Sequence, residues 1–213
     1  PPEMLRHLRT VLVAPMTTGS RPAGFRIPVS FNGKVRYTLT LPASAGKEEV
    51  EKAALADPAI PKARFQAGLD LLKAQPQTDP ARLAAIGYCF GGGVVLNAAR
   101  QGVPLAGVVS FHGALATNTP ATPGSVKAKI LVEHGARDSM ITPENVAAFK
   151  AEMDKAGADY TFVSLDGAKH GFSNPDADRL SHGDHGGPDI GYNKPADEKS
   201  WADMQAFFKK IFS

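Results

Sequence analysis

A single cysteine lies where an apolar segment meets a run of small residues, and this junction restricts the fold more than any other feature. Cys89 is the centre of Gly87-Tyr88-Cys89-Phe90-Gly91, which has the spacing G-x-C-x-G. A chain that turns directly from a strand into a helix crowds the positions two residues before and after the turn, so glycine is expected at both. The spacing predicts that Cys89 is held at a sharp strand-to-helix turn, a nucleophile elbow.

The helix that we expect to begin near Phe90 would favour the reactive form of the thiol. Its free N–H groups and the positive end of its dipole point at the sulfur and stabilise the thiolate. The backbone N–H of Phe90 is also our candidate oxyanion donor. A lone cysteine is ordinarily a small buried hydrophobe, but the flanking glycines favour a catalytic role for Cys89.

Two later apolar segments end in the acid and base that a thiolate nucleophile requires. Asp138 follows residues 130–134, and His170 follows residues 160–165. Nucleophile, acid and base therefore occur in the order typical of an α/β-hydrolase triad. In this interpretation His170 is the general base and Asp138 holds its tautomer. The alternatives are that Asp138 caps a helix near Pro143 and that His170 is an ordinary loop histidine.

Helix and strand signals alternate from residue 47 onward, which predicts an α/β-hydrolase-like fold: a mostly parallel sheet with helices on both faces. Between the expected elements, residues 114–127 form an ordered loop or lid, and residues 167–194 form a polar loop that borders the site. We expect helices at 47–56, 61–74, 90–100, 143–156 and 197–212, and strands at 83–88, 107–111, 130–134 and 160–165.

The first forty residues do not fit this alternation. Strands are expected at 10–14, 25–30 and 34–41, but the connector between the first two contains two prolines and two glycines. A parallel crossover needs at least ~10–12 residues including its helix, so an antiparallel hairpin or meander is expected. The predicted organisation is an atypical β segment at 1–40 and a hydrolase-like domain at 41–213. Met16 or Thr17 is the candidate source of a second oxyanion amide.

Length and composition agree with one modest enzyme domain, and for the hydrolase hypothesis we expect no cofactor. The chain has 213 residues, one cysteine and a formal net charge of +3. One cysteine excludes an intrachain disulfide, and the dispersed basic residues argue against a nucleic-acid partner. Without an apolar run of ~20 residues or a signal-peptide pattern, we expect no membrane association and a cytoplasmic location. We interpret His182-Gly183-Asp184-His185 as a solvated loop and predict no metal site.

Over about residues 45–213 the chain resembles the dienelactone hydrolase family, which has a cysteine nucleophile in a G-Y-C-F-G-G setting. The resemblance implies hydrolysis of small carboxylic esters or lactones, of the carboxymethylenebutenolidase type, through a thioester on Cys89, with Asp138 and His170 completing the triad. Because specialised dienelactone enzymes place an arginine shortly after the catalytic histidine, where this chain has Ser173 and Asn174, a broad or weak esterase is expected.

Further segments carry the same resemblance. They are 63–66, 79–87, 109–113, 134–138, 170–172 and 191–193. We expect Tyr88, His112 and Phe172, which lie in matched segments, to contact the substrate.

Residues 1–34 are similar to the middle of the MazF/PemK toxin endoribonucleases, which suggests a chimeric chain; the alternative is that these are ordinary strands. Of the toxin's functional residues only Thr17 could correspond, so RNA cleavage is not expected. The alternative to an active enzyme is a noncatalytic or residually active truncated hydrolase fold. Such a fold would self-associate through its amino-terminal strands into a homodimer, because an unpaired sheet edge invites pairing.

Overall fold

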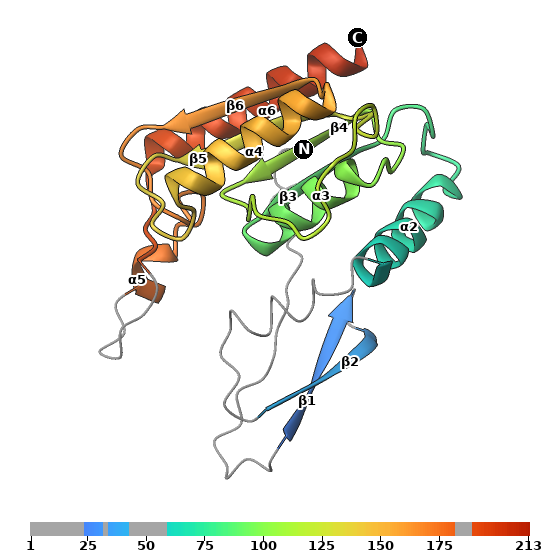
Figure 1. Cartoon of the computed structure of the whole chain (residues 1–213), viewed down its shortest axis with the longest axis horizontal. Helices are drawn as coiled ribbons and strands as arrows, with labels where there is room; N and C mark the ends of the chain where they lie inside the picture. Colours follow the sequence, from blue (N-terminus) through green and yellow to red (C-terminus); the bar gives the residue numbers. More distant parts are fainter. Residues whose placement is uncertain (1–23, 32–33, 43–58, 182–188) are drawn as a thin grey trace. The chain divides into compact units, whose positions relative to one another are not determined.

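The computed structural model describes residues 24–31, 34–42, 59–181 and 189–213. The chain divides into two units, Pro1–Pro61 and Lys62–Ser213. In the first unit, β1 (Gly24–Phe31) and β2 (Lys34–Pro42) pair antiparallel, with Phe31 opposite Lys34 (Figure 1). The strands expected at 25–30 and 34–41 are both present, but the hairpin or meander was expected to pair the first of them with the strand at 10–14. The strand expected at 10–14 and the helix expected at 47–56 lie outside the described residues.

The second unit is built on a parallel sheet, as its alternating signals predicted. Its strands lie in the order β3-β4-β5-β6, and every neighbouring pair is parallel. Each strand begins and ends within one residue of its expected position. The strands are β3 (Ala84–Tyr88), β4 (Gly107–Phe111), β5 (Lys129–Gly135) and β6 (Tyr160–Leu165).

The helices begin where capping side chains allow. Thr142 accepts a hydrogen bond from the Asn145 N–H at the start of α4, and Asn193 caps α6 in the same way. This cap starts α6 three residues before the expected position. The helices are α2 (Ala59–Lys73), α3 (Phe90–Arg100), α4 (Pro143–Ala156), α5 (Ala177–Ser181) and α6 (Lys194–Phe212). Within the part of the chain that the structure describes, no helix is both long and apolar enough to cross a membrane.

Side chains of the sheet alternate between two cores. On one face, Ile130 and Val132 of β5 join a cluster that includes Phe149 of α4 and residues of α3. On the other face, Leu131 joins a cluster that includes Met204 of α6. Helices therefore cover both faces, α3 and α4 on one and α6 on the other (Figure 1). The alternation follows from the period of two in a strand.

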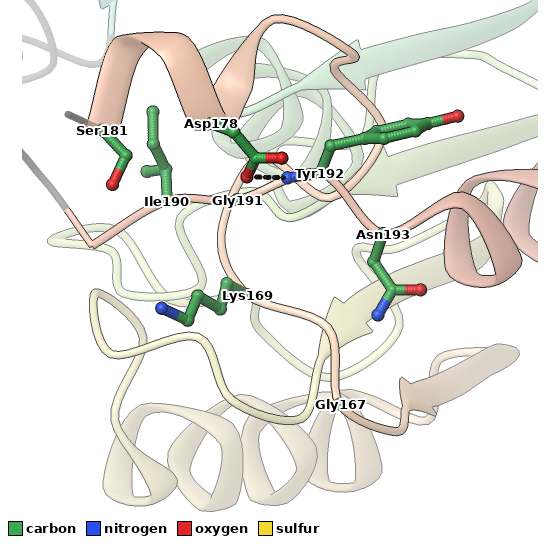
Figure 2. Close-up of a pocket in the computed structure, with 8 residues that line it drawn as sticks. All are labelled: Gly167, Lys169, Asp178, Ser181, Ile190, Gly191, Tyr192 and Asn193. Carbon is green, nitrogen blue, oxygen red and sulfur yellow. Dashed lines mark hydrogen bonds between the residues drawn. The ribbon is translucent and has the colours of Figure 1, made fainter.

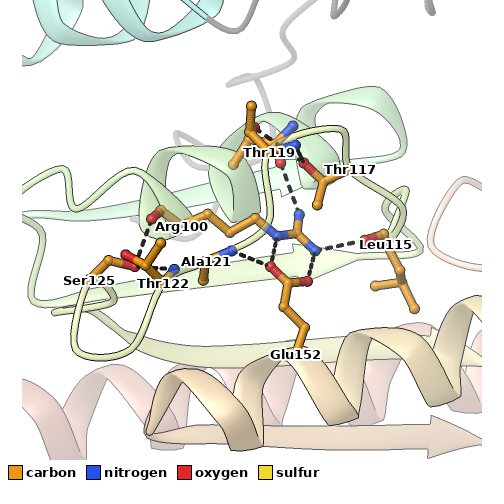
Figure 3. Close-up of polar contacts among 9 residues, drawn as sticks. Arg100, Leu115, Thr117, Thr119, Ala121, Thr122, Ser125 and Glu152 are labelled. Carbon is orange, nitrogen blue, oxygen red and sulfur yellow. Dashed lines mark hydrogen bonds and ion pairs between the residues drawn. The ribbon is translucent and has the colours of Figure 1, made fainter.

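The loop at 114–127 is ordered by a buried ion pair. Arg100 at the end of α3 is 3% exposed, and its guanidinium makes two bonds of 2.9 Å to Glu152 of α4. Arg100 also donates to the Leu115 carbonyl at 2.7 Å, and Glu152 accepts from the Ala121 N–H at 2.7 Å (Figure 3). The loop is therefore tied to both helices, as expected of an ordered segment rather than a linker.

Candidate active site

Cys89 lies directly between β3 and α3, where the chain turns with an unusual backbone. Its φ is 53° and its ψ is −121°. A residue with a side chain in such a conformation costs about 1–3 kcal/mol and persists only where the surroundings enforce it. Here the backbone N–H of Cys89 donates to the Phe111 carbonyl at 3.0 Å. The backbone carbonyl of Cys89 accepts from the N–H groups of Gly92 (3.0 Å) and Gly93 (3.3 Å). The predicted sharp turn is present.

The two glycines that flank the turn are not equally constrained. A Cβ on Gly87 would lie 2.0 Å from the Gly91 carbonyl oxygen, so only glycine fits there. A Cβ on Gly91 would have no atom within 4 Å. The expectation that both positions require glycine is therefore wrong for Gly91, whose backbone fills the space beside Gly87 while its own Cβ direction is open. Gly92 is also required, because its Cβ would meet the Gly113 Cα at 2.7 Å.

The fold brings Cys89, Asp138 and His170 together, although they are far apart in the sequence. A hydrogen bond of 3.2 Å joins Cys89 Sγ to His170 Nε2, and one of 2.8 Å joins His170 Nδ1 to Asp138 Oδ2. Asp138 follows β5 and His170 follows β6, so parallel strands deliver both to the same edge. Gly135 allows this approach, since a Cβ there would lie 2.7 Å from the Ala168 carbonyl oxygen.

The contacts of Asp138 and His170 bear on the two alternatives, a helix-capping role for Asp138 and an ordinary loop position for His170. Asp138 does not cap α4, because the capping residue is Thr142. The second oxygen of Asp138 instead accepts from the Met140 N–H at 2.9 Å. His170 is a buried loop histidine with both ring nitrogens bonded, one to the carboxylate and one to the sulfur. The arrangement can move a proton from the thiol to the imidazole.

The electrostatics of the site favour a charged imidazole. Burial by itself lowers the pKa of His170, but its hydrogen bonds to Asp138 and Cys89, together with their negative charges, outweigh burial and raise that pKa to about 9. A charged imidazole beside the sulfur favours the thiolate form of Cys89 over the thiol. The positive end of α3 adds to this stabilisation of the thiolate.

The remaining predicted site residues surround this centre. Phe90 is the first residue of α3, so its N–H is one of those that have no acceptor within the helix. Tyr88 is 38% exposed and stacks on Phe111, with ring centroids 4.5 Å apart. The ring centroid of His112 lies 5.0 Å from that of His170 and 5.1 Å from that of Phe172, which is fully buried, and both ring pairs are T-shaped. Met16 and Thr17 lie outside the described residues.

Two polar residues near the centre were not anticipated from the sequence. Ser173 Oγ forms a hydrogen bond of 2.9 Å with His112 Nε2, which is 61 residues away. Glu133 of β5 is fully buried, and neither carboxylate oxygen has a hydrogen-bond partner among the described residues. Burial and the nearby charge of Asp203 raise the pKa of Glu133 to about 8. No local pattern marks either residue, because both depend on contacts between distant segments.

The end of the polar loop after His170 forms backbone contacts with His170. Ile190 bridges to His170, and the Gly191 N–H donates to the His170 carbonyl at 3.1 Å. The loop also forms a pocket of about 300 Å³, in which Asp178 accepts from the Tyr192 N–H (Figure 2). The pocket is lined by Gly167, Lys169, Asp178, Ser181, Ile190, Gly191, Tyr192 and Asn193, so it contains none of the three predicted catalytic residues. Residues 182–185 lie outside the described ranges; within those ranges no three side chains of the metal-binding types gather.

A parallel sheet covered by helices, with an elbow after one strand and loops from two others meeting it, defines an α/β-hydrolase fold. Residues 44–212 match the model of the dienelactone hydrolase family. The chain belongs to this family, whose members are hydrolases.

Individual relatives agree with this assignment. The uncharacterized protein K02A2.1 of Caenorhabditis elegans is 32% identical over 155 residues, which are 71% of this chain and 94% of that protein. The crystal structure of P91, a dienelactone hydrolase-like promiscuous phosphotriesterase from metagenomic libraries, is 33% identical with a TM-score of 0.67, covering 80% of this chain and 70% of P91. The structure named m3DLH is 32% identical with a TM-score of 0.69, covering 83% of this chain and 75% of m3DLH.

Proposed function

We propose that the chain hydrolyses small carboxylic esters or lactones through a thioester on Cys89, with His170 as the base and Asp138 as the residue that orients it. The observation that carries this proposal is the continuous path of hydrogen bonds from Cys89 Sγ to His170 Nε2 at 3.2 Å and from His170 Nδ1 to Asp138 at 2.8 Å. Membership of a hydrolase family supports it.

The first half of the reaction forms the thioester. The Cys89 thiolate attacks the carbonyl carbon, and the carbonyl oxygen takes the negative charge beside the Phe90 N–H. When the tetrahedral intermediate collapses, the bond to the leaving oxygen breaks and His170 Nε2–H gives that oxygen its proton. In a lactone substrate the leaving alcohol stays attached to the acyl group.

The second half restores the enzyme. Water attacks the thioester carbon while the now neutral His170 accepts one of its protons. Collapse breaks the carbon–sulfur bond and releases the carboxylic acid, leaving the thiolate paired with the imidazolium. Asp138 keeps the tautomer that presents Nε2 to the sulfur and stabilises the imidazolium in both halves. Tyr88, His112 and Phe172 are the proposed walls of the substrate site.

The uniqueness of Cys89 makes the test specific, since the chain contains one cysteine. The full chain is assayed with p-nitrophenyl acetate before and after iodoacetamide, with the addition of one adduct verified by mass spectrometry. We expect turnover to disappear in proportion to labelling, and Cys89→Ala to be both inactive and unlabelled. Labelled protein that keeps its turnover would exclude the proposed nucleophile. Phosphotriesters belong in the substrate panel because P91 is described as a phosphotriesterase.

The proposed boundaries leave residues 1–40 outside this chemistry, as an atypical β segment joined to a hydrolase domain at 41–213. The start of the family match at residue 44 supports this division, and the toxin-like origin of the segment stays a prediction. The alternative of a residually active fold that self-associates predicts a concentration-dependent dimer with little ester turnover. Light scattering, which measures the oligomeric state, together with the p-nitrophenyl acetate assay before and after iodoacetamide distinguishes this alternative from the active hydrolase.

A further inference from the structure

A second histidine occupies a constrained position beside the proposed catalytic base. His112 directly follows β4, as Cys89 follows β3, and within the described ranges these two are the non-glycine residues with positive φ, at 39° and 53°. The His112 side chain is 4% exposed, and its ring meets the ring of His170 edge-on at 5.0 Å between centroids. Backbone strain persists only where the surroundings enforce it, so the fold holds this imidazole in place.

The hydrogen bonds of His112 assign its tautomer. Nε2 is 2.9 Å from Ser173 Oγ, whereas the buried Nδ1 has no partner in the described part of the chain. A buried N–H without an acceptor is rarer in proteins than an unused lone pair. The favoured tautomer therefore carries its proton on Nε2 and donates it to Ser173, leaving a bare lone pair on Nδ1.

Between about pH 3 and pH 9, the pKa values of the two histidines leave His112 neutral while His170 is charged. Burial, followed by the positive charge of His170, lowers the pKa of His112 to about 3. Asp138 acts in the opposite direction without reversing the shift. A neutral imidazole with its only N–H already committed takes no part in moving the thiol proton, so its effect on His170 is exerted through contact.

We propose that His112 and Ser173 form a clamp that positions the His170 ring against Cys89; this rests on the proposed function. Ser173 lies three residues past His170, and its bond to His112 ties that segment to the end of β4. The residue before His112, Phe111, accepts the Cys89 N–H at 3.0 Å. The end of β4 therefore contacts both the backbone of Cys89, through Phe111, and the segment after His170, through His112. The His112 ring also packs against the His170 ring.

The clamp predicts an effect on the Cys89–His170 pair that a general loss of stability would not produce. If His170 is less well held, its imidazolium stabilises the thiolate less, and the thiol becomes harder to ionise. The midpoint of the iodoacetamide alkylation rate against pH must then rise. This measurement requires no substrate, so it can be made even if ester hydrolysis fails as the proposed function.

The test uses Ser173→Ala in the full chain, with Ser173→Thr as the conservative replacement that keeps the hydroxyl. The matched control is Ser125→Ala, which removes a serine hydroxyl of similar burial that donates to the Arg100 carbonyl at 3.1 Å. For Ser173→Ala we expect kcat for p-nitrophenyl acetate to fall roughly three- to tenfold, as for loss of one hydrogen bond, with KM almost unchanged. The alkylation midpoint should rise. Ser173→Thr should restore both, and Ser125→Ala should behave as wild type.

A Ser173→Ala enzyme with wild-type kcat and an unshifted alkylation midpoint would overturn the clamp. Equal changes in Ser125→Ala would also overturn it, because the effect would then reflect general loosening. His112→Asn gives a second arm, since asparagine tolerates positive φ and can donate from its amide. It should retain more activity than His112→Phe, and the reverse order would count against the clamp. Failure of the proposed function has a separate sign: wild-type protein alkylated at Cys89 that still turns over ester.

Discussion

Gly87 and Gly91 flank Cys89 symmetrically in the sequence but not in space, and this difference can be measured. In Gly87→Ala the new Cβ would meet the Gly91 carbonyl oxygen at 2.0 Å, a backbone atom that cannot move without displacing α3. We expect a loss of at least about 2 kcal/mol in the free energy of unfolding and slower alkylation of Cys89. Gly91→Ala is the matched control and should gain roughly 0.5–1 kcal/mol, because alanine is favoured within a helix. Urea denaturation that gives equal stabilities would contradict this explanation of the elbow.

Glu133 also lies in an unusual environment, because it is fully buried and its carboxylate oxygens have no hydrogen-bond partner within the described ranges. Such a carboxyl group is more stable in its protonated form. The folded pKa of Glu133, about 8, lies above that of an exposed glutamate. Ionisation therefore favours the unfolded chain, and the resulting loss of stability grows as pH rises from ~4.3 towards 8.

Glu133→Leu should consequently stabilise the protein by on the order of 2–3 kcal/mol at pH 8 and by much less at pH 5. Denaturant titrations at both pH values measure this difference. Glu144→Gln is the control, since Glu144 is exposed and its pKa is lowered by a hydrogen bond with Thr142. An equal gain for Glu133→Leu at both pH values would show that ionisation is not the cause.

At the scale of elements, the Arg100–Glu152 pair joins α3, α4 and the loop at 114–127. Arg100 also lies over the Phe149 ring at 5.6 Å, so replacing its partner leaves a charge in an apolar setting. We expect Glu152→Gln to destabilise the fold by about 3–5 kcal/mol, the usual consequence of leaving a buried charge unpaired. Asp159→Asn, which breaks an exposed ion pair with Lys129, should change stability by less than about 1 kcal/mol.

The double replacement Arg100→Met with Glu152→Leu tests the same explanation. Removing both charges leaves no unpaired group, so it should cost less than Glu152→Gln alone. Thermal denaturation of the three variants and of the wild type is sufficient. If the double variant were the least stable, the contribution of the Arg100–Glu152 pair to stability would come from side-chain packing rather than from charge pairing.

At the scale of the whole molecule, four buried groups with shifted pKa values, Glu133, His170, His112 and His134, set how stability depends on pH. Glu133 contributes stability below ~4.3 that is lost as pH rises to about 8, and His170, with its pKa raised to about 9, contributes stability below ~6.5 that is lost by pH 9. His112 and His134 act in the opposite sense, because burial lowers the pKa of both. Stability is therefore lost as pH falls below ~6.5, towards about 3 for His112.

These signs predict a maximum of stability near pH 6, with a fall of roughly 1–3 kcal/mol per pH unit between ~6.5 and 8, where Glu133 and His170 act together. Urea denaturation at half-unit intervals of pH measures the profile. Glu133→Gln should reduce the slope on the alkaline side and should steepen the rise in stability between ~4.3 and 6.5, where ionisation of Glu133 opposes the effect of the histidines. Stability that rises from pH 6.5 to 8 would contradict the assignment of these groups.

Most elements of the second unit were predictable because their signals are local. The apolar strand before Cys89, the small residues after it, and Thr142 with Pro143 at the start of α4 each specify a conformation within a few residues. α5 was missed because five residues within a polar loop carry no helical periodicity. The early start of α6 depends on Asn193, whose capping role appears only once its backbone conformation is known.

The order of nucleophile, acid and base, the turn at Cys89 and the family resemblance were all present in the linear chain, because each is written in the types and spacing of neighbouring residues. Tertiary structure alone decided which groups meet. It brought the sulfur within 3.2 Å of the imidazole and joined His112 to Ser173. It also buried Glu133 with no hydrogen-bond partner among the residues that the structure describes, and left the Cβ direction of Gly91 open. Such outcomes depend on how β4, β5 and β6 stack their ends side by side, and no spacing along the chain encodes a contact between strands.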